Sequence, residues 1–321
     1  MITLASLQEG LSIRRLSSHT YVVELGYDSE RSDIPSPGYI ASCFLEVSRI
    51  HFSTTLAAYH QPHTVAVQLN YLRPTHGGCA VFKVRDLKLG GQTSVVQTTL
   101  IDYSGDTAGL SGRLDPARLG DELVTAYLTN TNMAQLKGSS IETNFELRPA
   151  PRPVNLQKLR EDEDASWKLH GALTFRQTDS GRDTVDLFLE KEPTLPRPTL
   201  DHWISFSDGT TFSTSSLGIV ADICVAKSDL HDKALALTDL SLPFLYKTTP
   251  AILNMDIKKI LPAAGAEFLF VRVQSKRIRN GRLDAEILIL DPDGDIVAVC
   301  NQMTLEERVH TSHRGSMLSK I

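Results

Sequence analysis

The apolar and polar positions of the chain follow two different periods, and these periods occur in the same order twice. In the first half, a predicted strand at residues 21–25 precedes a predicted helix at residues 35–50, whose apolar side chains recur at helical spacing. Three further strands are predicted at residues 64–72, 79–85 and 93–101. This half therefore predicts one long helix followed by an antiparallel meander.

The second half repeats this order, with a predicted strand at residues 201–206 and a predicted helix at residues 215–226. Four predicted strands follow, at residues 251–257, 267–274, 283–290 and 296–302. One helix per copy has too few companions for a bundle, so each sheet must wrap its helix to keep its apolar face out of water. The expected fold is an α+β double hotdog, two antiparallel sheets each wrapped around a long central helix.

The segment between the two copies differs in composition from both of them. Residues 147–154 hold three prolines, and residues 160–164 form an almost wholly acidic run. Proline removes a backbone donor and like charges repel, so this segment predicts a linker. The expected organisation is a first hotdog repeat, a linker, a second repeat and a tail, at residues 1–146, 147–198, 199–310 and 311–321.

The amino-acid composition makes some classes of binding partner and some environments less plausible for this chain. The 33 Lys and Arg residues against 38 Asp and Glu residues give a net charge of −5, which disfavours nucleic acid as a partner. No apolar run approaches the roughly 20 residues of a membrane-spanning helix. The cysteines lie far apart among apolar neighbours, which predicts reduced thiols in the core. They are Cys43, Cys79, Cys224 and Cys300.

Four motifs, in this order, carry a resemblance to a known family. They are Gln68-Leu-Asn-Tyr-Leu-Arg-Pro74, Leu87-Lys-Leu-Gly-Gly-Gln-Thr-Ser94, Ser216-Leu-Gly-Ile-Val-Ala-Asp222 and Asp293-Gly-Asp-Ile-Val-Ala-Val-Cys-Asn-Gln302. With them the sequence resembles the acyl-CoA thioesterase II family, a double hotdog in a single chain. The resemblance implies hydrolysis of a fatty-acyl or related acyl-CoA thioester, with no cofactor.

The resemblance also implies a catalytic site in the second copy. In that family an Asp, a Thr or Ser and a Gln hold the hydrolytic water. Asp222 falls on the family Asp, and Gln302 falls on the family Gln. The hydroxyl position falls on Pro250 or Ala251 with Thr249 beside it, so Thr249 is the third candidate.

Four further residues are expected to bind substrate. Gly38 stands at a helix start, where backbone N–H groups are open to a thioester oxygen. Tyr39 replaces a smaller residue of the family and predicts a narrower acyl entrance. Gln68 and Gly218 complete the expected contacts.

Other chemistries have weaker signals. No Gly-x-Ser-x-Gly elbow and no phosphate-binding glycine loop is present. The hydratase branch of double hotdogs needs a cooperating Asp and His, whereas the neighbours Asp201 and His202 would face opposite sides of a strand. His51, His60 and His63 are interpreted as solvated loop histidines, and no metal site is expected.

Two functional alternatives stay open beside hydrolysis. The first is a non-hydrolytic acyl-thioester-binding or biosynthetic accessory protein with a degenerate thioesterase site, and the second is a purely structural or interaction module. The terminal Ser319-Lys320-Ile321 resembles a Ser-Lys-Leu peroxisomal address, which an import receptor would read. We therefore expect a peroxisomal or cytoplasmic protein of lipid metabolism, and a homo-oligomer formed through the hotdog sheets.

Overall fold

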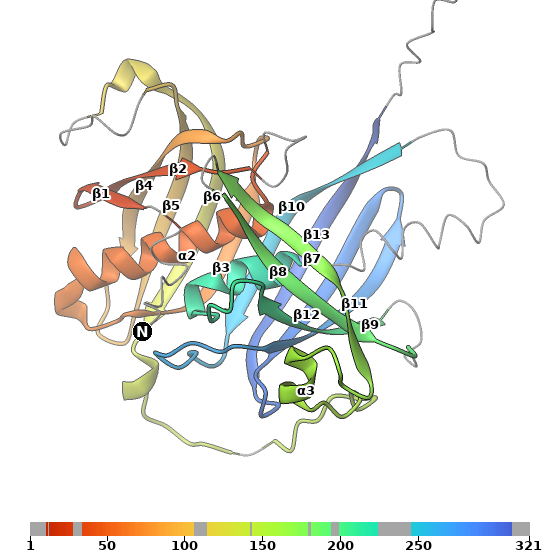
Figure 1. Ribbon diagram of the computed structural model, residues 1–321. Helices are drawn as coiled ribbons and strands as arrows, with labels where there is room; N and C mark the ends of the chain where they lie inside the picture. The colour runs from red at the N-terminus through yellow and green to blue at the C-terminus, as the bar shows by residue number, and fades with distance from the viewer. Residues whose placement is uncertain are drawn as a thin grey trace, which may run out of the picture.

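A computed structural model describes residues 11, 13–27, 34–105, 114–141, 143–178, 181–193, 199–223 and 245–309 (Figure 1). Strands dominate it. They are β1 (Arg14–Ser17), β2 (Thr20–Leu25), β3 (His63–Tyr71), β4 (Gly78–Lys88), β5 (Thr93–Tyr103), β6 (Leu119–Thr131), β7 (Trp167–Thr178), β8 (Gly181–Glu190), β9 (Thr199–Phe206), β10 (Leu245–Ile257), β11 (Leu269–Arg279), β12 (Arg282–Leu290) and β13 (Ile296–Val309).

All of these strands belong to one sheet, in the order β1-β2-β4-β5-β6-β3-β10-β13-β12-β11-β9-β8-β7. The expectation of two separate sheets was wrong. Strand β3 of the first copy pairs antiparallel with β10 of the second, and Leu69 lies opposite Leu253. Because each of these strands would otherwise leave its copy with an unpaired edge, the pairing satisfies backbone groups of both copies at once.

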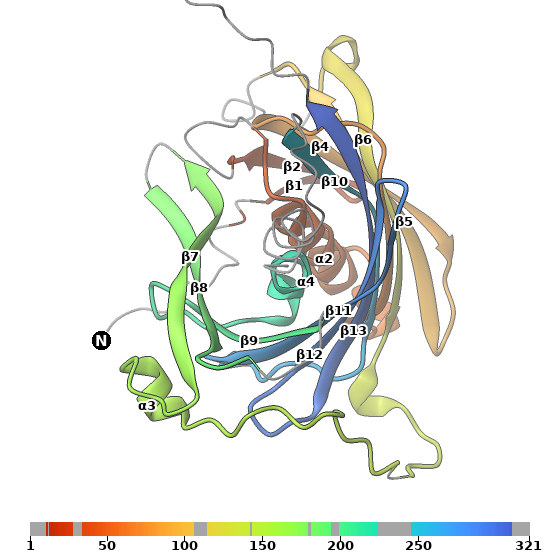
Figure 2. The ribbon, with the colours of Figure 1, turned by 90° about the vertical axis from the view of Figure 1, so that its right-hand side faces the viewer.

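The sheet curls around two helices, α2 (Pro37–Thr54) and α4 (Leu217–Asp222), which lie side by side (Figure 2). The predicted first helix is confirmed. The predicted second helix is confirmed only in part, since a 3-10 turn at Thr214–Ser216 precedes α4 and the helix ends at Asp222. Residues 224–226 of that prediction lie outside the described residues. The expected long central helix is therefore present only in the first copy.

Helix α2 is buried on nearly every side, and its polar side chains are satisfied within the core. Ser42 accepts a hydrogen bond from the backbone of α4, and Ser48 donates to Asn130 on β6 at 2.9 Å. The Glu46 carboxylate binds both Arg49 and Ser215. A buried polar group is costly only when it is unpaired, so these residues fit a central helix.

The predicted linker at residues 147–198 is a folded part of the second copy, so that boundary was wrong. It contains the helix α3 (Leu156–Arg160) and both β7 and β8, which extend the sheet beyond β9. Asp164, from the acidic run, is buried and accepts hydrogen bonds from the backbone N–H groups of Asn155, Ser166 and Trp167. Trp167 packs in a second apolar cluster with Trp203 and Phe270. The segment thus covers the outer face of the second-copy sheet.

Smaller expectations are confirmed in the described part of the chain. Asn280 and Gly281 both have positive φ, as a tight hairpin requires. Cys43 and Cys300 are buried, as expected, whereas Cys79 is partly exposed, and burial raises the pKa of Cys43 to about 12. Cys224 lies outside the described residues. Over the described ranges, no helix combines the length and the apolar character that crossing a membrane would demand.

Candidate active site

The site lies where helices α2 and α4 cross. Three polar contacts follow the crossing one helical turn apart, and they show that the helices run antiparallel. Asp222 meets the first turn of α2 at Gly38, Ser42 meets Ile219, and Glu46 meets Ser215 just before α4. Residues four apart on a helix share one face, so these contacts align the two copies along a single seam.

The carboxylate of Asp222 lies at the start of α2. Its Oδ2 accepts a hydrogen bond from the backbone N–H of Gly38 at 3.0 Å and from the hydroxyl of Ser36 at 3.3 Å. Ser36 is the N-cap of α2, yet its hydroxyl makes no capping bond. Asp222 therefore places a negative charge at the positive end of the long helix, where an anion is stabilised.

Gln302 completes the arrangement from the sheet. Its Nε2 donates to Asp222 Oδ1 at 2.9 Å, and the side chain is buried, with 2% of its surface exposed. Its Oε1 makes no hydrogen bond with any described residue. A buried amide oxygen without a partner is unusual in a protein, so this acceptor suits a water or a substrate group.

Two residues of this site were missed in the sequence, Ser36 and Tyr71. Tyr71 donates its hydroxyl hydrogen to the carbonyl oxygen of Pro37 at 2.7 Å. Burial, and then the negative charge of Asp222, raise the pKa of Tyr71 well above its ordinary value. Tyr71 belongs to the first resembling motif, but only the fold brings it to the start of α2.

Gly38 and Gly218 allow the two helices to touch. A Cβ on Gly38 would lie 2.6 Å from the Cβ of Asp222, and a Cβ on Gly218 would lie 2.4 Å from the backbone nitrogen of Ser42. Real Cβ atoms do not come this close to other atoms, so both positions require glycine for packing. Asp222 reaches the backbone of α2 through this close approach.

Tyr39 follows Gly38 but points into the protein interior. Its side chain is completely buried, and its hydroxyl makes no hydrogen bond within the described residues. The guanidinium of Arg176, on β7, lies 5.9 Å from the centre of its ring. Burial raises the pKa of Tyr39 well above its ordinary value, so this phenol stays neutral.

Gln68 is not brought to the site, which corrects the expectation that it binds substrate there. Its side chain is exposed, whereas its neighbours Val67 and Leu69 are buried. Leu69 pairs with Leu253, which pairs with Gln302, and residues paired across strands share one face. Gln68 therefore points to the outer face of the sheet, away from Asp222.

The third candidate, Thr249, has a described backbone only. It lies on β10 and pairs with Leu305, while Pro250 pairs with Thr304 and a β-bulge follows at Ala251. The Thr249 side chain lies outside the described residues. On β13, Thr304 is buried two residues beyond Gln302, so the two side chains share a face.

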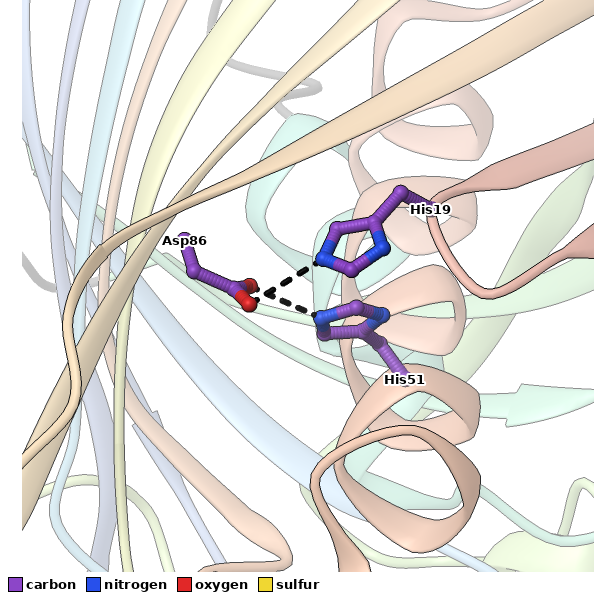
Figure 3. A group of neighbouring side chains, drawn as sticks. All are labelled: His19, His51 and Asp86. Atoms are coloured by element: carbon purple, nitrogen blue, oxygen red, sulfur yellow. Dashed lines mark hydrogen bonds and ion pairs between the residues drawn. The ribbon is translucent and has the colours of Figure 1, made fainter.

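The histidines are arranged differently from the sequence expectation. His51 is not a solvated loop residue: it lies on α2, is completely buried, and contacts Tyr21. It also contacts Asp86 (Figure 3). His63 is half-buried and accepts a hydrogen bond from the backbone of Met133, and His60 is exposed. The three histidines thus occupy separate environments.

Asp201 and His202 do face opposite sides of β9, as predicted. Asp201 forms a buried, bidentate pair with Arg272, with both N–O distances at 2.6 Å. Burial lowers the pKa of His202 to about 4, an effect partly offset by the backbone of Ile223. No cooperating Asp–His pair of the hydratase kind forms from these two residues.

A pocket of about 300 Å³ opens at the other end of the helix crossing, between the two copies. The C-terminal half of α2 lines it with Leu45, Arg49 and Ser53, and the turn before α4 adds Ser215. It is mainly apolar, with one cation at its edge. Two helices enclosed by a single curled antiparallel sheet are the arrangement of a double hotdog fold.

Comparison with known proteins identifies the family. Residues 30–131 match the acyl-CoA thioesterase N-terminal domain, and residues 149–305 match the acyl-CoA thioesterase C-terminal domain. The chain belongs to this acyl-CoA thioesterase family. The second match begins within the segment predicted as a linker, in agreement with the strands found there.

Individual relatives support the fold. The thioesterase-like protein TwmA of Talaromyces wortmannii is 28% identical, over 94% of this chain and 92% of that protein. A putative thioesterase II from Thermobifida fusca is 19% identical, with a TM-score of 0.64 over 93% of this chain and 98% of the other. The acyl-CoA thioesterase II TesB2 of Mycobacterium marinum is 14% identical, with a TM-score of 0.60 over 95% and 98%.

Proposed function

We propose that the protein hydrolyses fatty-acyl or related acyl-CoA thioesters, using a water held between Asp222 and Gln302. The observation that carries this proposal is the buried amide of Gln302, whose nitrogen binds the Asp222 carboxylate while its oxygen has no partner among the described residues. Such an amide can accept one hydrogen of a water molecule while the carboxylate accepts the other.

In the proposed reaction, the Asp222 carboxylate takes a proton from the water as the water oxygen bonds to the thioester carbonyl carbon. The tetrahedral intermediate then breaks its C–S bond, and the proton passes to the leaving sulfur. The products are the carboxylic acid and the free CoA thiol. The N–H of Gly38 and the hydroxyl of Ser36 hold the carboxylate in place through its other oxygen.

We propose that Thr304 on β13 supplies the hydroxyl that the family carries on the strand after the second-copy helix, which is β10 here. Thr304 lies directly opposite Pro250, one of the two positions onto which the family hydroxyl falls, and shares the inner face with Gln302. Thr249 pairs instead with Leu305, which is exposed. Thr304→Val should then lower the rate of hydrolysis.

The activity is tested by incubating the purified chain with acyl-CoA esters of increasing acyl length and following the release of free thiol. A reaction without substrate corrects for labelling of the partly exposed Cys79. We expect turnover that depends on acyl length and that is lost in Asp222→Asn. No thiol release from any ester would overturn the proposal.

A second candidate function, non-hydrolytic acyl binding, is favoured by one observation. The β10 positions paired with Thr304 and Gln302 are Pro250 and Leu253, so this strand offers no hydroxyl there. An accessory protein of this kind would retain acyl-CoA without cleaving it. Recovery of intact, protein-bound acyl-CoA after prolonged incubation would support it over slow hydrolysis.

We further propose a peroxisomal location in lipid metabolism, based on Ser319-Lys320-Ile321, which lie outside the described residues. A fluorescent protein fused before the N-terminus would leave this address open to an import receptor. The fusion should co-localise with a peroxisomal marker, and deletion of the last three residues should disperse it. A cytoplasmic signal from the intact fusion would contradict this location.

We also propose that chains assemble into a homo-oligomer through the outer face of the sheet. Tyr127 on β6 and Leu305 on β13 expose 42% and 43% of their surfaces. Light scattering after size-exclusion chromatography should give a multiple of the 35.4 kDa chain mass. A monomeric mass at micromolar concentration would contradict it.

A further inference from the structure

His19, His51 and Asp86 form a compact cluster outside the candidate active site (Figure 3). His19 lies in the turn between β1 and β2, His51 on α2 and Asp86 on β4. The Nε2 atoms of His19 and His51 lie 3.0 Å from Asp86 Oδ2 and 3.1 Å from Asp86 Oδ1, respectively. The ligand-type atoms of all three residues lie within 4.8 Å of one another.

The opposite nitrogen of each ring is held by a hydroxyl group. Tyr21 Oη lies 2.9 Å from Nδ1 of His51, and Ser18 Oγ lies 2.8 Å from Nδ1 of His19. The Tyr21 hydroxyl is also oriented to donate to the carbonyl oxygen of Ser18, at 3.4 Å. The tautomer of His51 sets which of Tyr21 Oη and His51 Nδ1 is the donor, and Nε2 is the ring nitrogen that faces Asp86.

Both Nε2 atoms face the Asp86 carboxylate, so a metal ion could take the place of the protons between them. We propose that His19, His51 and Asp86 bind one divalent transition-metal ion of the zinc type. Two imidazole nitrogens and one carboxylate oxygen form a ligand set that zinc accepts, whereas magnesium and calcium prefer oxygen ligands alone. The second nitrogen of a metal-bound histidine is usually held by an acceptor, and the hydroxyl oxygens of Tyr21 and Ser18 can take that role.

The burial of the cluster fits a site with one open side. His51 is completely buried, while the side chains of Asp86 and His19 are 23% and 40% exposed. A metal ion could therefore enter beside His19 and keep a water as its fourth ligand.

The cluster is separate from the proposed hydrolytic site. His51 and Gly38 lie thirteen residues apart on α2, which corresponds to about 20 Å along the helix axis. The three ligands come from different elements, and β1 is an edge strand of the sheet. The metal would fasten the β1–β2 hairpin and β4 to the central helix, so its effect would be on stability rather than on turnover.

The test is a calorimetric titration of the chelator-treated full chain with zinc, and separately with magnesium. We expect one tightly bound zinc ion per chain, no magnesium binding, and a zinc-dependent rise in the melting temperature. His19→Ala and Asp86→Asn should weaken zinc binding at least about tenfold. Tyr21→Phe, which keeps all three ligands, should weaken it by roughly 10- to 100-fold.

The matched control is His60→Ala, because His60 is an exposed histidine outside the cluster. This variant should bind zinc as the wild type does, and circular dichroism should show that every variant is folded. Two results would overturn the proposal: a wild-type chain that binds no tight zinc ion, or unchanged zinc affinity in His19→Ala and Asp86→Asn. The wild-type titration decides the matter even where a variant fails to fold.

Discussion

Two of the contacts across the α2–α4 crossing use the same residue spacing and differ in chemistry. Gly38 precedes Ser42 by four residues on α2, and Gly218 precedes Asp222 by four residues on α4. Each glycine admits the other helix, and each polar residue accepts a backbone N–H across the crossing at 3.0 Å. Only Asp222 also binds a buried amide from the sheet.

This difference distinguishes a contact that only packs the two helices together from a contact that can also take part in a reaction. A serine hydroxyl is enough to satisfy a backbone donor where two helices cross, as Ser42 does. A charged carboxylate is more costly to bury, and it needs the helix terminus and Gln302 to offset that cost. We infer that Ser42 of the first copy has a structural role only, whereas Asp222 of the second copy takes part in the reaction.

A large effect is expected from Gln302→Leu. Loss of an amide that orients the water should lower kcat by about two to three orders of magnitude, as removal of one transition-state donor does in other enzymes. Asn301→Leu is the matched control, because Asn301 is an exposed amide one residue earlier on the same strand. Equal rates in the two variants would remove Gln302 from the site.

The next effect is on the pH dependence of the unfolding free energy, and it comes from a buried histidine. Each copy has one buried histidine among the described residues, His51 in the first and His202 in the second. His51 has two hydrogen-bonding partners, whereas His202 has none of normal geometry among the described residues. The pKa of His202 falls from an ordinary 6.5 to about 4 on folding, so the unfolded chain binds more protons between these values. Stability should therefore fall as the pH drops through this interval, by about 3 kcal/mol from this residue.

Urea unfolding of the wild type and His202→Leu at several pH values between 7 and about 4 measures this contribution. The variant should show a shallower pH dependence than the wild type, whatever its absolute stability. Parallel pH profiles would contradict the assignment.

A smaller effect is expected from Gly218→Ala. The added methyl group would meet the backbone nitrogen of Ser42 at 2.4 Å, so the helices must separate, at a cost of about 1–3 kcal/mol of unfolding free energy. Gly91→Ala is the control, since a Cβ there would meet no atom within 4 Å. Similar unfolding midpoints for both variants would argue against close packing at the crossing.

The smallest effect is expected from Ser42→Ala. It leaves the buried N–H of Ile219 without its acceptor and should cost about 1 kcal/mol. Because Ser42 binds only a backbone N–H across the crossing, kcat should stay the same. A fall in kcat comparable to that of Gln302→Leu would show that both contacts serve catalysis.

Local patterns in the sequence predicted much of the fold. The apolar spacing from Ile40 to Ile50 located α2, and the Asn280-Gly281 pair located a hairpin with positive φ. The motif order placed Asp222 and Gln302 in the second copy, and the structure brings them within 2.9 Å. These features depend on periodicity and turn chemistry, which a sequence displays directly.

Features that depend on distant partners could not be predicted in this way. Strands β7 and β8 lie between proline-rich stretches, and their stability comes from pairing with β9. Gln68 resembles a site residue, but strand register turns it outward. His19, His51 and Asp86 come from three separate elements, and no local spacing links them.

The most direct test of the central claim compares acyl-CoA hydrolysis by the wild type and by Asp222→Asn. The amide keeps the size of the carboxylate but can no longer accept a proton from water, so kcat should fall by about two to four orders of magnitude. Circular dichroism and substrate binding should show that the variant is folded and still binds acyl-CoA. Hydrolysis at the wild-type rate by Asp222→Asn would contradict the account.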